Sequence, residues 1–441
     1  MVDHPTQIFY NSVDWKAKRR EKFEYIEKAG NVLGIDWKEI TPNTDNLWLT
    51  EGMEAEFDTF LPIGTQEAKA GEGEAIFENY SNGVKTHRDV WAYNFDRASV
   101  AKNIHRTIET YNQHVYRWER LAQKPNVDEF VSNNQREISW SASLKSYLQS
   151  PITLLFDASH IRDACYRPFT RMRFYFDHHL NERRYQFPYF FPTESSEKEN
   201  RVICVPGTGN RKQFSVLATD RIPALDLAFE KAQCFPFYTY AEDGSNRQEN
   251  ITDWALAQFR SHYADESIDK WAIFHFVYAL LHHPRYREKY AANLRRSLPR
   301  IPFAPDFWSF AQAGKRLAEL HVNYEEQPEY PLQWVENPAA AMSFRVEKMK
   351  LSRDKSSLQY NNFLTLTGIP PAVFDYKLGN RAALEWVIER YQITTDKRSS
   401  IVNDPNAYSD NPQYIVQLIG KVVTVSVETV AIVAGLLDLG V

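Results

Sequence analysis

The chain of 441 residues contains only three cysteines, Cys165, Cys204 and Cys234, and they lie far apart. So few and so scattered thiols exclude a disulfide framework and a cysteine-ligated zinc site, and we expect them to be buried and reduced. The chain also lacks a positively charged start followed by an apolar run. No signal peptide is therefore expected, and the protein is predicted to be cytoplasmic.

An excess of positive charge is absent as well. The 52 Lys and Arg residues are outnumbered by 57 Asp and Glu residues, which gives a net charge of −5. The protein as a whole is thus not a polycation, and any site for nucleic acid must be a local patch. Aromatic residues, in contrast, make up 14% of the chain, enough both for a core and for surfaces on which bases stack.

The common catalytic signatures are missing too. The sequence has no GxxxxGK[ST], HExxH, GxSxG or CxxC motif, no [DN]PP[YF] loop of an amino-methyltransferase and no glycine-rich strand–turn–helix for a nucleotide. The stretch "PGTGNRK" at 206–212 has the wrong spacing for a phosphate loop, so we interpret it as a turn and keep its Asn210 and Arg211 as candidate DNA contacts. The helix-end histidines His275, His282 and His283 are interpreted as packed polar groups. We therefore predict no catalytic residue and no metal ligand.

One apolar run, 422–440, approaches the length of a membrane span. Lys421 lies at its edge and Glu428 lies within it, and apolar residues recur at helical spacing from Ile415 to Leu436. This pattern is typical of an amphipathic helix that packs on a core, and we do not expect a membrane span.

The pattern of elements predicts an α+β protein, with a mixed, largely antiparallel sheet unit, helical insertions and a C-terminal helical and strand portion. Residues 1–65 contain a strand ("TQIFYNSV") and a helix closed by Gly30, with no visible partner strand, which is half of an α/β unit. Residues 66–330 form the main unit, in which "VWAYNF" and "FYFD" are among the expected strands. Residues 331–441 return to strands such as "FRVEKMKL" and end in helices.

A basic cluster lies in the stretch "YSNGVKTHRDVWAYNF" at 80–95. Asn82-Gly83 favours a tight turn with positive φ, and the residues after it are rich in nitrogen donors and followed by an aromatic ring. Such a turn can hold a phosphate, but an ordinary basic hairpin tip has the same pattern. The candidate DNA-contacting residues here are Lys85, Thr86, Arg88 and Trp91, with His87 beside them.

Arginines and aromatic residues alternate in a second stretch, "YRPFTRMRFYFD" at 166–177. In an extended strand, Arg171, Arg173 and Tyr175 share one face, so a guanidinium can fork onto a guanine in the major groove. Arg167 is a fourth candidate. The alternative is a face of solvated or ion-paired structural arginines, for example with Asp177 or Glu182. A third basic stretch, "RYREKYAANLRRSLPR", is interpreted as solvated helix surface or as a face that follows a DNA backbone.

The sequence resembles the C-terminal specificity region of type ISP restriction–modification enzymes from about residue 76 to the end. The resemblance is carried by the stretches at 80–95 and 166–177 together with "ITDWALAQFRSHY", "LTGIPPAVFDYKLGNRAALEWVIERY" and "SSIVNDPN". In that family one polypeptide carries a nuclease, a helicase-like motor, an amino-methyltransferase and this target recognition domain. Residues 1–65 resemble the closing strand and helix of the methyltransferase domain. The resemblance implies that catalytic parts, S-adenosylmethionine and ATP belong to the parent enzyme, and that this chain needs no cofactor.

The resulting hypothesis is a domain that reads a short asymmetric duplex DNA site and presents an adenine to a methyltransferase. Its expected partners are double-stranded DNA and the methyltransferase, helicase and nuclease parts of the parent enzyme or a separate subunit, and no membrane. Two alternatives remain. The chain is a methyltransferase with its own active site, which binding of S-adenosylmethionine would reveal, or it is a protein-interaction module.

Overall fold

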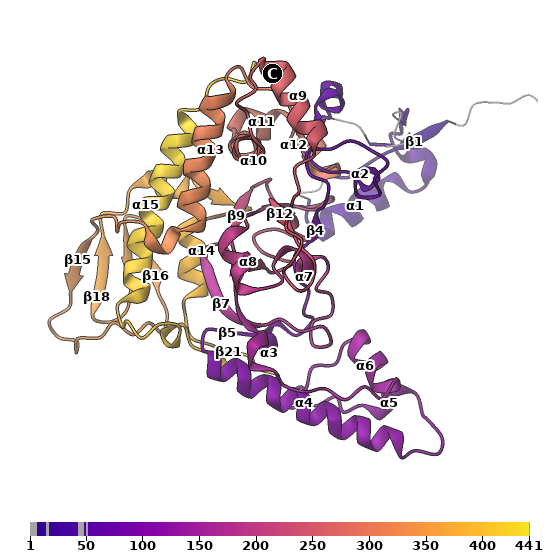
Figure 1. The fold of residues 1–441 in the computed structure, drawn as a ribbon, viewed down its shortest axis with the longest axis vertical. Helices are drawn as coiled ribbons and strands as arrows, with labels where there is room; N and C mark the ends of the chain where they lie inside the picture. Colours follow the sequence, from indigo (N-terminus) through magenta and orange to yellow (C-terminus); the bar gives the residue numbers. More distant parts are fainter. Residues whose placement is uncertain (1–6, 15–16, 43–47, 50–51, 441) are drawn as a thin grey trace, which may run out of the picture. The chain divides into compact units, whose positions relative to one another are not determined.

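The computed structural model of the chain describes residues 7–14, 17–42, 48–49 and 52–440. The chain divides into two compact units, Met1–Ala55 and Glu56–Val441, which are described separately. Helices alternate with several small, mostly antiparallel sheets (Figure 1), so the fold is α+β as predicted.

The N-terminal unit contains β1 (Ile8–Tyr10), α1 (Arg19–Ala29), a 3₁₀ turn η1 (Val32–Gly34) and β2 (Lys38–Ile40). Gly30 closes α1 with a φ of 71°, as the sequence predicts. The expectation of a strand without a partner is wrong, because β1 pairs antiparallel with β2. A three-residue strand is too short to show the alternation by which a strand is predicted.

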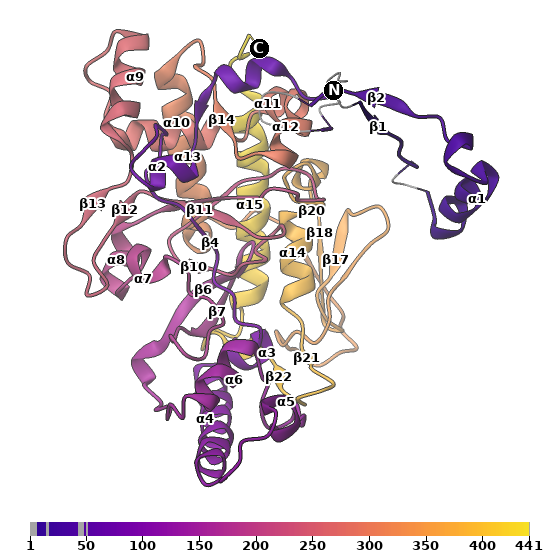
Figure 2. The same cartoon turned by 90° about the vertical axis from the view of Figure 1, so that its right-hand side faces the viewer.

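Two four-stranded sheets lie at the centre of the larger unit (Figures 1 and 2). In the first, β6 and β7 form an antiparallel hairpin, β5 joins β7 antiparallel, and β10 joins β6 in parallel. The second sheet is entirely antiparallel. In spatial order the strands are β10 (Ile222–Pro223), β6 (Ile161–Arg167), β7 (Thr170–Tyr175) and β5 (Tyr93–Asn94), then β4 (Ser81–Asn82), β11 (Gln233–Pro236), β8 (Val202–Val205) and β9 (Leu217–Thr219).

Short helices connect these strands. The expected strand "VWAYNF" is instead a helical turn, α3, followed by β5, because the Asp89 carboxylate and the bend at His87 favour a helix start. The short elements of this region are η2 (Ala55–Thr59), α2 (Gln66–Lys69), α3 (Asp89–Ala92), η3 (Ala158–His160), α7 (Phe187–Phe190) and α8 (Glu194–Glu199).

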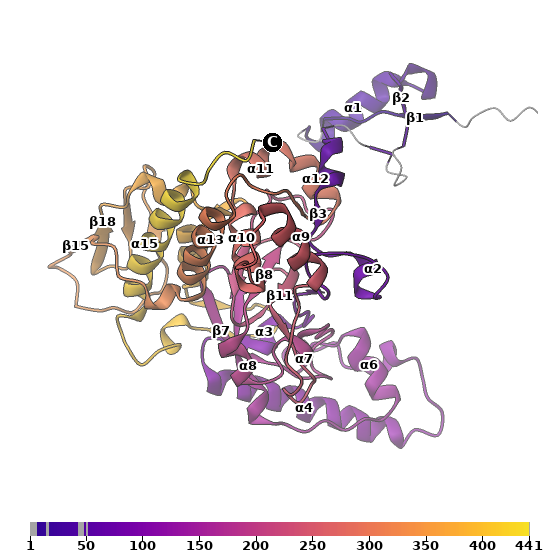
Figure 3. The same cartoon turned by 45° about the horizontal axis from the view of Figure 1, so that its top comes forward.

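A helical arm is inserted between β5 and β6. Its long helix, α4 (Arg97–Glu119), begins at Asp96, whose carboxylate accepts from the backbone amides of Ala98 and Ser99. One face of α4 buries Ile104, Tyr111 and other residues against α5 (Val127–Phe130) and α6 (Ala142–Gln149), in a core cluster of its own (Figures 2 and 3).

A helical layer follows the second sheet, and α10 and α13 form its centre. Gly314 of α13 allows the close approach, since a Cβ there would lie 1.8 Å from the carbonyl oxygen of His275 in α10. The elements of this layer are α9 (Asp253–Tyr263), α10 (Lys270–Leu280), α11 (Pro284–Lys289), α12 (Ala291–Arg296), α13 (Phe307–Val322) and η4 (Tyr324–Glu326), with the small pairs β12 (Tyr238–Thr239) with β13 (Gln248–Glu249) and β3 (Leu61–Pro62) with β14 (Arg300–Ile301).

The C-terminal part adds an antiparallel sheet and two helices to the same compact unit. Of the expected strand "FRVEKMKL", only the last two residues pair. The elements are β15 (Gln333–Glu336), β18 (Leu364–Thr367), β17 (Ser357–Gln359) and β16 (Lys350–Leu351) in sheet order, then η5 (Pro371–Phe374), β19 (Lys377–Leu378) with β20 (Arg381–Ala382), α14 (Ala383–Arg390), β21 (Thr394–Thr395) with β22 (Val402–Asn403), η6 (Pro405–Ala407) and α15 (Tyr414–Ala434).

Helix α15 is long and apolar enough, by length and composition, to cross a membrane. Its most apolar window is 61% buried inside the structure, and the helix packs beside α13 and α14 (Figure 1). Ile415, Leu418 and Val422, on the predicted apolar face, are all buried. α15 therefore packs as a core helix, as its amphipathic pattern predicts.

Candidate nucleic-acid interface

The stretch 80–95 does not form a hairpin, because its residues pair with distant parts of the chain. β4 pairs with β11, Val84 then bridges Ala224, and Lys85 bridges Arg183. Gly83 does not have positive φ; it is required because a Cβ there would lie 2.7 Å from the Ala224 carbonyl oxygen. The left-handed residue of the stretch is His87, with φ of 58°.

Arg88 is buried, with 3% of its surface exposed. Its guanidinium donates to the Ser139 carbonyl at 3.1 Å, the Leu180 carbonyl at 2.5 Å and the Ser141 hydroxyl at 2.7 Å. Burial lowers the pKa of Arg88 to about 10, so it remains protonated at neutral pH. These bonds tie the base of the helical arm to the first sheet. They favour a structural role for Arg88 over the expected phosphate contact.

Thr86 and Trp91 are also internal, at 1% and 3% exposure. The Thr86 hydroxyl donates to the Asp89 carboxylate and accepts from the Arg88 amide, and the Arg106 guanidinium lies 4.4 Å from the Trp91 ring centroid. Neither residue is available to DNA in this conformation. Of the four candidates in this stretch, only Lys85 lies partly exposed, and the described structure records no ion pair for it.

Two arginines of the β6–β7 hairpin form ion pairs with acidic residues. Arg171 pairs with Glu325, donates to the Val322 carbonyl at 2.9 Å and lies 3.5 Å from Asp220. Arg173 pairs with Asp163, directly across the hairpin. Both share one strand face, as predicted, but their partners are not the expected Asp177 or Glu182.

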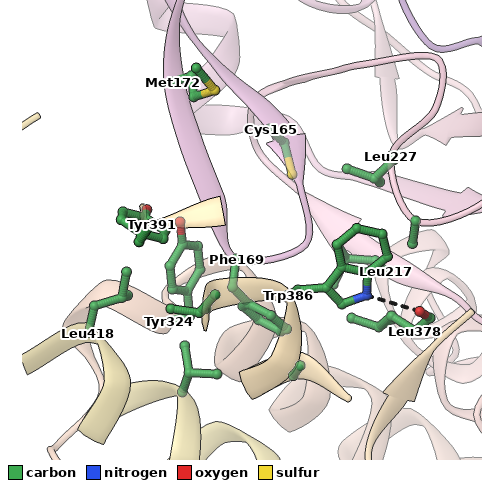
Figure 4. Packing of buried hydrophobic residues seen from close by; sticks show 14 of the residues in the cluster. Cys165, Phe169, Met172, Leu217, Leu227, Tyr324, Leu378, Trp386, Tyr391 and Leu418 are labelled. Carbon is green, nitrogen blue, oxygen red and sulfur yellow. Dashed lines mark hydrogen bonds between the residues drawn. The ribbon is translucent and has the colours of Figure 1, made fainter. Parts of the chain in front are cut away.

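The remaining hairpin candidates are held by aromatic packing. Tyr175 is fully buried and stacks on Phe156, while its hydroxyl accepts from the Asp157 amide at 3.1 Å. Arg167 lies 4.0 Å from the Tyr166 ring and donates to the Tyr166 carbonyl. At the hairpin turn, Phe169 lies beside Tyr324 (Figure 4). This hairpin therefore joins the first sheet to the helical layer and the C-terminal part.

The two basic stretches meet in the fold. β5, at the end of the first stretch, pairs with β7 of the second, with Asn94 opposite Arg173. The ring of Tyr93 stacks on Phe174 at 4.3 Å, and the Tyr166 hydroxyl donates to Asp89 at 3.4 Å. The two sequence motifs thus lie side by side in one sheet, but most of their candidate side chains are buried or paired within the protein.

The turn 206–212 separates its two candidates. Asn210 is buried, accepts from the Glu230 amide at 3.4 Å and donates to the Lys212 carbonyl at 3.3 Å. Arg211 is exposed, and no ion pair or hydrogen bond of its guanidinium occurs in the part of the chain that the structure describes. The amide of Gly209 donates to the Arg295 carbonyl at 2.7 Å, which joins this turn to α12.

A polar pocket of about 250 Å³ opens beside this turn. Four side-chain amides, two tyrosines and one lysine contribute to its wall. The lining residues are Gln66, Lys69, Tyr80, Ser81, Asn82, Tyr185, Gln186, Thr208, Gln233 and Leu298. They come from α2, β4, β11, α12's end and two turns, so only the tertiary fold assembles them.

Five cations lie two or three positions along the chain from residues that line this pocket, and we call them the rim cations. Backbone contacts connect their segments: Lys85 bridges Arg183, Lys231 is packed against Gly207, and the Arg295 carbonyl accepts from the Gly209 amide. No ion pair of any of them occurs among the described residues, although Glu230 is the direct chain neighbour of Lys231. The rim cations are Lys85, Arg183, Arg211, Lys231 and Arg295.

Three residues in the segments that carry the pocket wall and the rim cations have strained backbones. His87, Tyr185 and Lys231 have φ of 58°, 50° and 52°, in the left-handed region that side chains other than glycine rarely adopt. Such conformations concentrate at binding and catalytic sites, where surrounding structure holds them. No sequence pattern predicted Tyr185 or Lys231, because positive φ at a non-glycine residue has no simple sequence signal.

The third basic stretch is largely paired. Arg285 pairs with Asp438, Lys289 pairs with Glu56, and Arg287 donates to the Leu281 carbonyl. The histidines are packed polar groups: His321 joins the hydroxyls of Tyr278 and Thr429, and burial lowers the pKa of His275 to about 4. Within the described residues, no cluster of His, Cys, Asp or Glu has the arrangement of a metal site.

Comparison with known proteins gives the family. A model described as the Type ISP C-terminal specificity domain matches residues 75–418. Among curated proteins no sequence match is found. Three solved structures share the fold over 98% of this chain: a nuclease-deletion mutant of the type ISP restriction–modification enzyme LlaGI in complex with a DNA substrate mimic (31% identity, TM-score 0.84), a DrdV–DNA complex (36%, 0.83) and the ATP-dependent type ISP enzyme LlaBIII bound to DNA (28%, 0.85).

The chain spans only 39%, 43% and 28% of the length of those three proteins. The similarity therefore concerns their specificity part and leaves the remainder of each protein unmatched. Taken with the family model, which covers most of the larger unit, it establishes that this chain belongs to the C-terminal specificity (target recognition) domain family of type ISP restriction–modification enzymes.

Proposed function

We propose that this chain recognises a specific duplex DNA sequence and that the surface around the pocket, with its rim cations, is the recognition surface. The observation that supports the proposal most is the family match together with relatives that were solved with DNA bound. Rim cations attract the phosphate backbone, and amide side chains beside them read base edges. A net charge of −5 makes such a local patch necessary.

The test is selection of bound sequences from random duplex DNA by the full chain, followed by anisotropy titrations of the selected site at several salt concentrations. We expect one enriched asymmetric sequence and tighter binding to it than to scrambled DNA by at least 10³-fold, as is typical of specific binding. Absence of binding at low salt, or binding without any enriched sequence, contradicts the proposal.

We also propose that the domain presents an adenine to a methyltransferase outside this chain. The exposed apolar side chains of the N-terminal unit support such a partner: Phe23 and Ile26 of α1 are 53% and 61% exposed, and α1 buries no residue. An apolar helix face that is left uncovered is typical of a contact surface. Added methyltransferase region should protect the amides of α1 from hydrogen exchange, while the chain alone transfers no methyl group and gives no binding heat with S-adenosylmethionine or ATP.

A further inference from the structure

Two side chains of the pocket wall are bonded to each other across the second sheet. Asn82 and Gln233 are directly opposed residues of β4 and β11. The Gln233 side-chain amide donates to the Asn82 side-chain oxygen at 2.7 Å. Both residues also line the pocket. The pair is thus fixed by backbone register and by its own hydrogen bond before any ligand arrives.

This bond determines what the pair can still offer. Each amide carries one oxygen acceptor and one nitrogen donor group. When one residue gives its donor and the other its acceptor, one acceptor oxygen and one amide nitrogen are left over. Among the described residues neither Asn82 Nδ2 nor Gln233 Oε1 has a recorded partner. Exchanging nitrogen and oxygen in both amides gives the same result, so the remaining pattern does not depend on how the amides are oriented.

One donor beside one acceptor is complementary to adenine. In the major groove adenine shows the N7 acceptor next to the N6 amino donor, whereas guanine shows two acceptors. Cytosine there offers a donor and thymine an acceptor with a methyl group. Asparagine and glutamine are the side chains that pair with this edge of adenine in known complexes.

The other walls suit a planar base. Tyr80 is buried and stacked on Phe235 at 5.1 Å, and the Lys69 ammonium lies 4.8 Å from its ring and donates to the Tyr80 carbonyl at 3.0 Å, so this ring supports the wall and is not itself a free stacking face. Tyr185 lines the pocket and is 37% exposed, so its ring is available to pack on a ligand. Tyr185 therefore offers a ring on which a base can stack, and Lys69 supplies a positive charge in the same pocket.

We propose that this pocket binds one adenine of the recognised DNA through the edge formed by Asn82 and Gln233. The inference rests on the proposed function, since it names the base that the recognition surface reads. The same adenine edge can come from two sources, a base that stays paired with its major-groove edge turned to the pocket or a base extruded from the duplex.

The protein-side experiment converts one amide to a carboxylate. Gln233→Glu, or Asn82→Asp, leaves two acceptors in place of a donor and an acceptor, which repels adenine N7. We expect the affinity for the selected site to fall roughly 10- to 100-fold, the range of one bidentate base contact. Repeated selection should lose its preference at a single adenine position. Gln359→Glu, an exposed β17 residue outside the pocket, makes the same charge change and should leave the site unchanged.

The DNA-side experiment keeps the chain unaltered, so a misfolded variant cannot obscure the result. Each adenine of the selected site is replaced in turn by 7-deazaadenine, which lacks N7, and by purine, which lacks the N6 amino group. We expect both analogues to weaken binding at the same single position, and that effect to vanish in Gln233→Glu. A 2-aminopurine placed next to this position brightens if the adenine is extruded and stays dark if it remains paired.

The two failures are distinguishable. A chain that selects no DNA sequence contradicts the proposed function. A chain that selects a site, but whose Gln233→Glu and Asn82→Asp variants select the same site with unchanged affinity, retains the proposed function and removes the pocket as an adenine site.

Discussion

The arginines in and beside the first sheet, which we call the sheet arginines, lie in the same compact unit as the rim cations and carry the same charge, but their surroundings differ. Arg88, Arg171 and Arg173 are each satisfied by carbonyls, hydroxyls or carboxylates of the fold. Lys231 and Arg211, around the pocket, are exposed and have no recorded ion pair in the described residues. A cation whose donors are already used holds elements together, whereas one whose donors face water is available to a phosphate.

The comparison predicts opposite effects of mutation, and it fails if the two groups behave alike. Loss of a sheet arginine should reduce the free energy of unfolding and leave the recognised sequence unchanged. Loss of a rim cation should leave stability unchanged and weaken DNA binding.

The largest effect is expected for Arg88→Ala. The substitution leaves the carbonyls of Ser139 and Leu180 and the hydroxyl of Ser141 without their donor inside the protein. We expect the free energy of unfolding, measured by denaturant titration, to fall by about 3–5 kcal/mol. Arg88→Lys keeps the charge but not the forked guanidinium, so its free energy of unfolding should lie between those of the unaltered chain and of Arg88→Ala. Unchanged stability with uniformly weaker DNA binding contradicts this and restores the phosphate role.

A smaller loss is expected at Arg171, which is partly exposed. Arg171→Met leaves Glu325 without its cation, whereas Asp220 keeps its ion pair with Arg221, and we expect a loss of about 2–3 kcal/mol. Glu325→Gln in the same chain should recover part of it. A double-mutant cycle measures this coupling, which we expect at about 0.5–3 kcal/mol. Additive effects would show that the ion pair does not join β7 to η4.

The sequence was sufficient for much of the fold and for the family. The long helices α4, α13 and α15 follow their apolar periodicity, α4 and α13 also begin at capping aspartates, and the quoted stretches carry the family resemblance. The three-residue strand β2 was missed, and the first half of the strand expected at 90–95 is the helical turn α3, because so short a segment shows no period and only its pairing partner defines it.

The site was harder to predict, because the role of a charge depends on distant residues. Arg171 and its partner Glu325 are 154 positions apart, and Asn82 and Gln233 are 151 apart. The sequence placed Arg171 and Arg173 on one face correctly, but it could not show which acids cover them. It also overlooked "ERRYQ" at 182–186, where the only available signal was basic residues next to a tyrosine.

For the rim cations, we expect Lys231→Gln and Arg211→Gln to weaken DNA binding without changing stability. Each lost phosphate contact should reduce the slope of log affinity against log salt by about 0.9, for every DNA sequence alike. The melting temperature should stay constant, since surface substitutions usually change stability by less than about 0.5 kcal/mol. Lys350→Gln, an exposed β16 residue away from the pocket, is the matched control. Equal slopes in all three variants would remove these cations from the recognition surface.

The smallest effect is expected for Arg173→Ala, which separates the sequence-based interpretation from the structural one. Arg173 and Asp163 are 28% and 31% exposed, so solvent screens their ion pair, and its loss should cost at most about 1 kcal/mol of stability. If Arg173 instead forks onto a guanine, as the alternating strand pattern suggested, the variant loses about 1–3 kcal/mol on the selected site and its preference at one base. Because Asp163 and the Tyr408 ring already occupy the guanidinium, we expect the selected sequence to be identical to that of the unaltered chain. Asp163→Asn is the discriminating partner: it should lower stability by a similar small amount if the pair is structural. If it tightens DNA binding by freeing Arg173, the hairpin belongs to the recognition surface, and the contrast between the two groups of cations ends at this residue.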